Sequence, residues 1–144
     1  MINLSRKSLL ALEAVLDVAL HARPDPVQAR DITERQAIPQ RYLEQIMQAL
    51  VRANILRGVR GPRGGYRLAR ERRRISVKEI FDVIGDMEKE DDHIASASQL
   101  NSDIIQPFHD QLQTALAQSI GETTIADLCN DAQKQTNQDS DFTI

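Results

Sequence analysis

Arginine recurs every three or four positions between Ile55 and Arg70. These arginines are Arg57, Arg60, Arg63, Arg67 and Arg70. The stretch Gly61–Gly65 contains three glycines and a proline, which favour a tight turn, so the residues on either side are predicted to form two short strands, 55–60 and 66–70. A guanidinium group is attracted to phosphate and to the narrow minor groove of A·T-rich DNA, where negative potential is concentrated. The spacing therefore predicts a basic β-hairpin with Arg60 beside its turn, and with Arg63 and Arg67 facing phosphate or solvent.

A second group of polar side chains, Gln40, Arg41 and Glu44, lies just before that hairpin in the sequence. Each type can read a base edge in the major groove of double-stranded DNA: Gln pairs with adenine, Arg with guanine, and Glu accepts from the amino group of cytosine. These side chains are useful for reading only if one helix presents them together on its outer face.

The apolar residues that follow have the spacing of such a helix. They are Tyr42, Leu43, Ile46, Met47, Leu50 and Val51, a helical stripe that leaves Gln40, Arg41 and Glu44 free to face outward. Pro39 suits the first helical position, because its missing N–H would have no partner there. A shorter helix is predicted over residues 27–36, so the pair forms a helix-turn-helix, whose second helix can enter a major groove.

The chain resembles the IscR-type (Rrf) family of bacterial transcription regulators over about Met1 to Leu128. The residues that carry the resemblance are D-I-x-E-R-Q-x-I-x-x-x-Y-L-E-Q-I-x-x-x-L from Asp31, R-G-P-x-G-G-Y-x-L-A from Arg60, L-x-A-V-L-D-V-A-L from Leu12 and T-I-A-D-L from Thr124. The resemblance implies a mainly α-helical fold: a winged helix-turn-helix with a two-stranded wing, followed by a long C-terminal helix that crosses its partner in a homodimer. It also implies major-groove contacts from Gln40, Arg41 and Glu44, of which Glu44 fits the family motif best, and a minor-groove contact from Arg60.

The first helix is predicted over about Ser5 to Ala22, with a core-facing line through Leu9, Leu12, Leu16 and Ala19 that Ala11, Val15 and Val18 widen. Ser5 and Lys7 stand at its start, where free N–H groups and positive charge favour a phosphate. Ordinary capping of the helix by Ser5, with Lys7 in solvent, explains the same residues equally well.

Charge divides the chain into two unlike halves. Up to Phe81 there are 16 Lys and Arg against 8 Asp and Glu, a net of +8, whereas from Asp82 onward there are 2 against 13, a net of −11. A basic half is typical of a nucleic-acid binder, and the acidic half is expected to point away from phosphate. The sequence motifs of hydrolases, zinc proteases and phosphate-binding loops do not occur, so an enzyme is not expected. A cytoplasmic protein without a membrane partner is expected, because no apolar run is long enough to span a bilayer.

The predicted boundaries are a DNA-binding domain over 1–85, an exposed acidic loop over 86–99, a dimerisation helix and a short further helix over 100–129, and a disordered tail over 130–144. Ser76 and Glu79 match a capping box that opens the last helix of the first domain, which is predicted to end near Gly85. Ile104, Phe108, Leu112, Leu116 and Ile120 repeat every four residues. We expect this long stripe to pair with a second copy of the chain, because two-fold dimers match two-fold operators; the alternative is that it folds back on its own core.

The chain departs from the resembled family at the iron–sulfur cluster that many members hold. The cluster loop contains no cysteine, and the resemblance places Gln106 at the histidine-ligand position and His109 at a tryptophan. Cluster irons need mainly thiolate ligands, so no cofactor and no metal are expected. Asp91, Asp92 and His93 could bind a hard cation, although a solvated acidic loop explains them better.

The sequence thus predicts a homodimeric, sequence-specific DNA-binding regulator without a cluster, with its protein or small-molecule effector left open. The alternative is a protein-interaction or redox module, in which the acidic half binds a partner that controls DNA binding or Cys129 acts as a sensor. A small, buried and unreactive Cys129 is the simpler interpretation of that residue.

Overall fold

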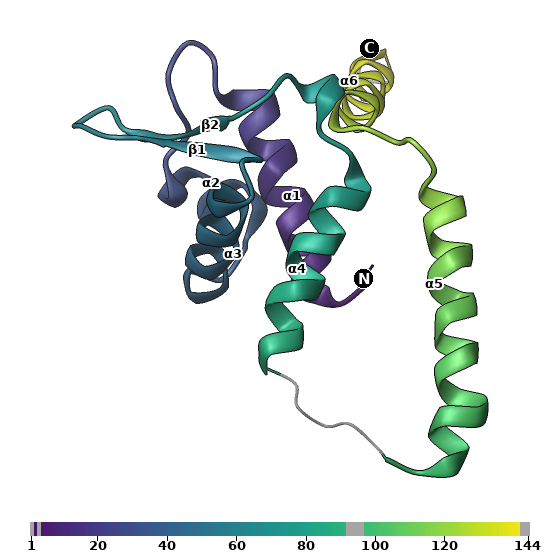
Figure 1. The fold of residues 1–144 in the computed structure, drawn as a ribbon. Helices are drawn as coiled ribbons and strands as arrows, with labels where there is room; N and C mark the ends of the chain where they lie inside the picture. Colours follow the sequence, from purple (N-terminus) through teal and green to yellow (C-terminus); the bar gives the residue numbers. More distant parts are fainter. Residues whose placement is uncertain (1, 3, 92–96, 142–144) are drawn as a thin grey trace.

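A computed structural model describes residues 2, 4–91 and 97–141. Figure 1 shows a helical body with a β-hairpin projecting from it, and the helix over residues 106–120 standing beside the body. The elements in chain order are α1 (Arg6–His21), α2 (Ala29–Gln36), α3 (Gln40–Arg52), β1 (Leu56–Val59), β2 (Gly65–Leu68), the short helix η1 (Arg72–Arg74), α4 (Val77–Asp91), the π-helical segment η2 (Asn101–Ile105), α5 (Gln106–Ile120) and α6 (Ile125–Asp141). This confirms the predicted mainly helical winged helix-turn-helix.

Helix α1 forms the centre of the core and packs against α2, α3, α4 and α6. Its fully buried face runs through Ala11, Val15 and Val18. The predicted line through Leu9 was wrong in part, because Leu9 is exposed while Leu12 and Leu16 are only half-buried. Small residues occupy the deepest positions because neighbouring helices approach α1 closely on that side.

The helix-turn-helix forms as predicted, with α2 and α3 joined by a short turn. Ala37 takes a left-handed conformation with φ of 54°, which ends α2, and Ile38 in the turn is fully buried. Pro39 is the N-cap of α3 and not its first helical residue. The apolar stripe of α3 packs on the core through Leu43, Ile46, Met47 and Leu50, while Val51 remains partly exposed.

The two strands pair antiparallel, with Leu56 opposite Leu68 and Val59 opposite Gly65. The wing is fastened to the body at Val27 and Tyr66, which exchange backbone hydrogen bonds of 3.0 and 2.7 Å. Gly65 lies so close to the Val27 carbonyl that a Cβ would collide with it, so glycine is required there. The hairpin is therefore held at its base, and its turn extends away from the core (Figure 1).

The capping box that opens α4 is present. The Ser76 N–H donates to a Glu79 carboxylate oxygen at 2.9 Å, and the Glu79 N–H donates to the Ser76 hydroxyl at 3.1 Å. Helix α4 does not end near Gly85 but continues to Asp91. The predicted acidic loop over 86–99 is thus helical in its first part, and residues 92–96, with the proposed ligands Asp92 and His93, lie outside the described residues.

Helix α5 ends at Gly121, as predicted, in a conformation with positive φ. Pro107 stands in its first turn, directly after the π-helical segment. A proline ring collides with the carbonyl four residues earlier, and a wider turn at that point relieves the collision.

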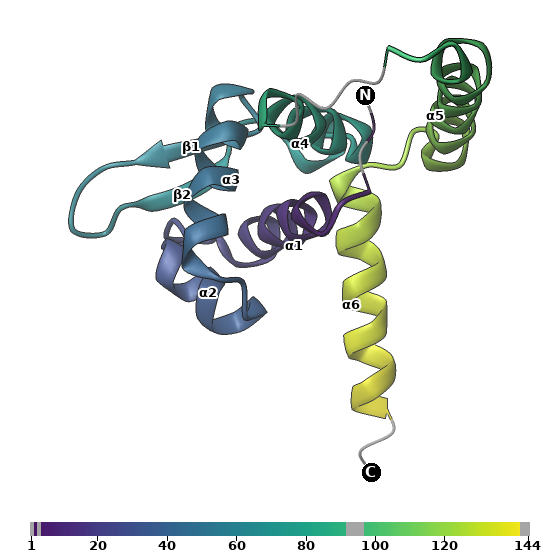
Figure 2. The same ribbon diagram turned by 90° about the horizontal axis from the view of Figure 1, so that it is seen from below.

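The predicted disordered tail was wrong for residues 130–141, which continue α6 (Figure 2). A second capping box opens this helix: the Thr124 N–H donates to Asp127 at 2.9 Å, and the Asp127 N–H donates to the Thr124 hydroxyl at 3.2 Å. Only the first turns of α6 reach the core, through Ile125 and Cys129. Among the described residues, no helix combines the length and the apolar character that crossing a membrane requires.

Candidate nucleic-acid interface

The start of α3 presents the three predicted base-reading residues together. Gln40, Arg41 and Glu44 are all exposed, whereas Ile46, on the opposite side of the helix, is fully buried. This arrangement follows from the apolar stripe, since burying one face of α3 turns the polar positions outward. The structure places these residues on one exposed helical face and does not itself test their role.

Tyr42 connects the start of α3 to the start of α1. The guanidinium carbon of Arg41 lies 4.9 Å from the centre of the Tyr42 ring, and Nζ of Lys7 lies 5.8 Å from it on a different element. Lys7 also donates to the Gln45 side chain at 3.4 Å. Lys7 therefore lies beside the start of α3, a neighbour that the sequence did not predict, and its contact with phosphate remains a prediction.

Ser5 is the N-cap of α1, which is the simpler of the two roles considered for it. Its side chain accepts from the Ser8 N–H at 3.2 Å and donates to a Glu88 carboxylate oxygen at 2.6 Å. A carboxylate at this point reduces the attraction for phosphate. Contact of Ser5 with DNA remains a prediction.

The wing divides its arginines between two tasks. Arg60 and Arg63 are exposed, and neither guanidinium group has a hydrogen-bond or ion-pair partner among the described residues. Arg67, predicted to face phosphate or solvent, instead donates to the carbonyl oxygens of Ala22, at 2.9 Å, and of Pro24. The prediction for Arg67 was wrong because the segment after α1 returns over β2 and offers unpaired carbonyl groups.

Sequence reasoning missed Arg30. It is exposed in the first turn of α2 and lines a shallow hollow of about 320 Å³ together with Arg63 and Pro62 of the wing turn. One feature of the sequence could have identified Arg30: it comes two residues before the buried Ile32 in the predicted helix. Arg30 adds a cation between the wing and the helix-turn-helix.

The comparisons with known proteins agree with this geometry. The family described as "Rrf2: Iron-dependent Transcriptional regulator" matches residues 4–131. This chain belongs to the Rrf2 family. The family consists of transcriptional regulators, in agreement with the expectation of a regulator and not an enzyme.

Curated relatives that are named as transcriptional regulators match more than half of this chain. The HTH-type transcriptional regulator IscR of Xenorhabdus nematophila is 44% identical over 82 residues, 57% of this chain and 50% of that protein. IscR of Vibrio cholerae is 43% identical over 82 residues, 57% of this chain and 47% of that protein. The chain thus spans about half the length of the curated relatives that it matches.

Solved Rrf2-type structures cover more of the chain. The structure of T. potens IscR has a TM-score of 0.72 at 28% identity, covering 93% of this chain and 90% of that one. CymR, the global cysteine regulator of B. subtilis, has a TM-score of 0.67 at 22% identity over 90% of this chain and 98% of that one, which supports the fold alone.

The residues of this chain do not fit the iron–sulfur cluster that the sequence comparison raised. Its one cysteine, Cys129, is fully buried in α6. In the described part of the chain, no three side chains among His, Cys, Asp and Glu gather as a metal site. A cluster takes four ligands, mostly thiolates, which one buried thiol cannot supply.

The environment of Cys129 also disfavours a redox role. Burial raises the pKa of its thiol above the ordinary value, and the nearby charge of Arg72 opposes this only in part. The reactive form is the thiolate, which a raised pKa makes scarce. Cys129 is best described as a core residue that fixes α6 against α1.

Proposed function

We propose that this Rrf2-family protein is a sequence-specific DNA-binding regulator that acts as a homodimer and without an iron–sulfur cluster. In the proposed complex α3 enters the major groove, where Gln40, Arg41 and Glu44 contact base edges. Arg60 lies in the minor groove, and Arg63 and Lys7 contact phosphate. The observation that carries the proposal is the single exposed surface that unites the start of α3 with Lys7 of α1.

Electrostatics support the same orientation. The guanidinium groups of Arg60 and Arg63 are exposed and have no partner among the described residues, so they are available to phosphate or to a narrow minor groove. Arg30 of α2 and Arg63 of the wing turn line the same hollow, which Asp25 and Asp31 also line, so cations from both elements face one region of the surface. Most acidic residues of the second half lie on α4 and α6; Glu88 of α4 reaches the surface beside Lys7, where it accepts a hydrogen bond from Ser5.

The homodimer is supported by the exposed apolar side chains of the η2–α5 segment. Leu100, Ile104, Phe108 and Leu112 are 66%, 58%, 56% and 46% exposed, and they repeat every four residues on one side of the helix. Such a stripe in water is unfavourable unless something covers it, and a second copy of the same helix is self-complementary. In Figure 1 this part of α5 stands apart from the body.

The rest of the predicted dimer stripe packs within the chain. Leu116 and Ile120 contact the small cluster around Ile2 and Phe81. Gln113 fixes this end further, since it donates to the Ile2 carbonyl at 2.7 Å and accepts from its N–H at 2.8 Å. The alternative of folding back on the core therefore applies to the C-terminal half of α5, and the dimer surface that we propose is limited to residues 100–112.

The function is tested by selecting bound sites from random DNA duplexes and then measuring binding to a selected site by fluorescence anisotropy at several salt concentrations. We expect an enriched two-fold sequence and a logarithm of affinity that falls linearly with the logarithm of salt concentration, because phosphate contacts release counterions. A variant with Arg60 and Arg63 both changed to Gln provides the matched control, and its salt slope should be shallower. Failure to enrich any sequence, together with salt-independent binding, would remove the proposal.

A further inference from the structure

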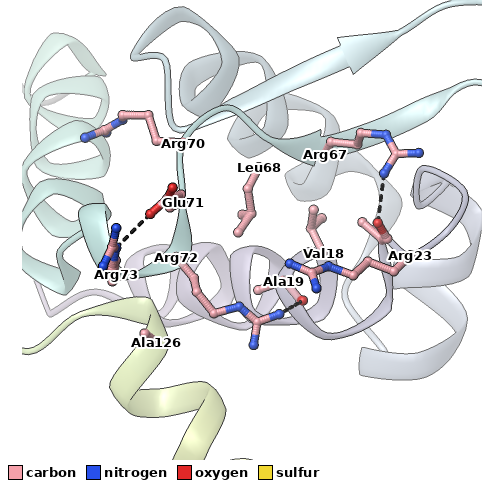
Figure 3. A pocket seen from close by; sticks show the side chains of 11 residues that line it. Val18, Ala19, Arg23, Arg67, Leu68, Arg70, Glu71, Arg72, Arg73 and Ala126 are labelled. Atoms are coloured by element: carbon pink, nitrogen blue, oxygen red, sulfur yellow. Dashed lines mark hydrogen bonds and ion pairs between the residues drawn. The ribbon is translucent and has the colours of Figure 1, made fainter.

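A cavity of about 670 Å³ opens between the C-terminal end of α1, strand β2, the η1 segment and the start of α6 (Figure 3). We call it the arginine cavity. Its apolar lining comes from Val18, Ala19, Leu68 and Ala126. Its volume is within the range of about 300–1,000 Å³ that small-molecule sites occupy. The lining residues come from elements other than α3, so this cavity is separate from the base-reading surface.

The charges that line the arginine cavity do not balance. Five arginines line it, and Glu71 is the acidic residue among the lining. Glu71 pairs with Arg73 at 2.7 Å, and Arg70 pairs at 2.9 Å with Glu79, outside the lining. Arg23, Arg67 and Arg72 remain, and none of them has a carboxylate partner in the part of the chain that the structure describes.

Backbone carbonyl groups occupy only some of the donors of these three arginines. Arg72 donates to the Ala19 carbonyl at 2.6 Å, and Arg67 donates to the Ala22 carbonyl at 2.9 Å. A guanidinium group has five N–H donors, so both retain unused ones. The side chain of Arg23 has no hydrogen-bond partner among the described residues, and Figure 3 shows it extending along α1 toward Ala19, where Arg72 also binds.

Like charges held over an apolar surface repel one another unless an anion lies between them. Carbonyl groups at the end of a helix carry only partial negative charge, so they satisfy hydrogen bonds without neutralising the three cations. Arginine binds carboxylate and phosphate through paired, charge-assisted hydrogen bonds. An anion with an apolar body would satisfy both the unused donors and the apolar lining.

We propose that the arginine cavity binds a small organic anion. Its carboxylate or phosphate group lies between Arg23 and Arg72, and its short apolar body contacts Ala19, Leu68 and Ala126. Carboxylate and phosphate share this recognition chemistry, and the test below distinguishes them. The binding itself does not depend on the proposed DNA-binding function.

A regulatory consequence does rest on the proposed function. Leu68 and Arg67 belong to β2, so the anion would contact the wing directly. A ligand that prefers one position of the wing must change the affinity of the protein for DNA, and DNA must change the affinity for the ligand by the same factor.

The binding is tested without DNA, on the full chain, by calorimetric titration and by amide chemical shifts. The probes are glutarate as the carboxylate, butyl phosphate as the phosphate, inorganic phosphate as an ion without an apolar body, and glutaramide as the neutral counterpart of glutarate. We expect saturable binding of glutarate or butyl phosphate at millimolar concentration or below, with the largest shifts at residues 18–23, 67–73 and 126. Whichever of the two binds more tightly identifies the head group.

Two variants and one control make the result specific. Arg23→Gln removes a guanidinium group that has no partner among the described residues, so it should weaken binding about ten-fold or more through the loss of a charge-assisted hydrogen bond. Ala126→Leu fills the cavity without changing its charge, and it should weaken binding by a similar factor because the apolar part of the ligand loses its space. Arg52→Gln, at an exposed position at the end of α3, should bind like the unchanged protein. Circular dichroism verifies that each variant is folded.

Four outcomes would overturn the proposal. They are no saturable binding of either organic anion, equal binding of glutaramide, unchanged affinity in Arg23→Gln, and equal affinity for inorganic phosphate and both organic anions. The last outcome would mean an adventitious ion only.

Discussion

The carboxylate of Asp17 accepts a hydrogen bond on each oxygen from the guanidinium group of Arg35, at 2.8 and 2.9 Å. Asp17 lies in α1 and Arg35 in α2, and Gln36 adds a third hydrogen bond at 2.9 Å. The Asp17 side chain is fully buried. This contact fastens the first helix of the helix-turn-helix to the core, so it fixes the position from which α3 projects.

Replacing Asp17 with Asn is expected to destabilise the protein by roughly 1–3 kcal/mol, because the buried amide would turn an N–H toward the donors of Arg35 and Gln36 and would lose the charge attraction to Arg35. Urea unfolding followed by circular dichroism measures the effect. Glu71→Gln is the matched control, since its pair with Arg73 is exposed on both sides and exposed pairs contribute about 0–1 kcal/mol. Equal stability of Asp17→Asn and the unchanged protein would contradict this account of the contact.

The same contact predicts a pH dependence. Burial alone would raise the pKa of Asp17, but the hydrogen bonds from Arg35 and Gln36 and the charge of Arg35 outweigh it, so the pKa is lowered. A carboxyl group with a lowered pKa in the folded state stabilises the fold at pH values above its ordinary pKa of about 3.9, and this stabilisation is lost as the pH falls through the folded-state value. The stability difference between the unchanged protein and Asp17→Asn should therefore be constant near neutral pH and should narrow below about pH 4. A difference that persists undiminished in acid would exclude the ion pair as its source.

The two kinds of wing arginine should respond differently to mutation. Arg60→Ala should weaken binding to a selected DNA site by about ten-fold and leave the melting temperature unchanged, because its guanidinium group has no partner within the chain. Arg67→Ala should lower stability by about 1–2 kcal/mol, because the Ala22 and Pro24 carbonyl groups lose their donor. Anisotropy titration and thermal unfolding of both variants give the two readouts. If Arg60→Ala loses stability but keeps its affinity for DNA, Arg60 has a structural role and does not contact DNA.

Changing Ile104 and Phe108 to Asp should convert the proposed dimer to monomers and remove high-affinity binding to a two-fold site. Both side chains are more than half exposed in the single chain, so the change disturbs no internal packing. A control with Gln111 and Gln118 changed to Asp adds the same charge at exposed polar positions of α5. Sedimentation velocity should show monomers only for the first variant, and an unchanged sedimentation coefficient would place the dimer surface elsewhere.

Anaerobic reconstitution with iron and sulfide should leave the protein colourless and without stoichiometric iron, since Cys129 is the chain's one cysteine and lies buried. Visible absorption and iron analysis provide the measurement, and Cys129→Ser should give the same result. Charge-transfer bands that disappear in Cys129→Ser would show that the thiol holds a cluster after all.

The sequence predicted correctly those features of the structure that depend on residues close together in the chain. The capping box of Ser76 and Glu79, the stop at Gly121 and the outward face of α3 all follow from side chains within a few positions of one another. The contacts that depend on the fold were not predictable in this way. Arg67 binds a segment about 45 residues earlier, and Leu9 is exposed because no neighbouring helix covers that side of α1 in the described part of the chain.

The helical structure of residues 130–141 in α6 could not be predicted from the sequence for a different reason. Residues 130–141 are polar and bury little, which is typical of a disordered tail, yet the capping box of Thr124 and Asp127 and the anchoring of Cys129 start a helix that continues through them. The capping pair was visible in the sequence, but its effect on the residues that follow depends on the packing of Ile125 and Cys129 against α1.

The central claim is that the start of α3 reads DNA sequence, and Glu44 tests it most directly. The measurement is the relative affinity of Glu44→Ala for a selected site and for all its single-base variants, with Glu13→Ala, an exposed position on α1, as control. The account predicts that Glu44→Ala loses roughly 1–3 kcal/mol of discrimination at one position in each half-site, while discrimination elsewhere is retained and Glu13→Ala is unchanged. An unaltered specificity profile in Glu44→Ala would contradict the account, because it would mean that α3 does not lie in the major groove with this face toward the bases.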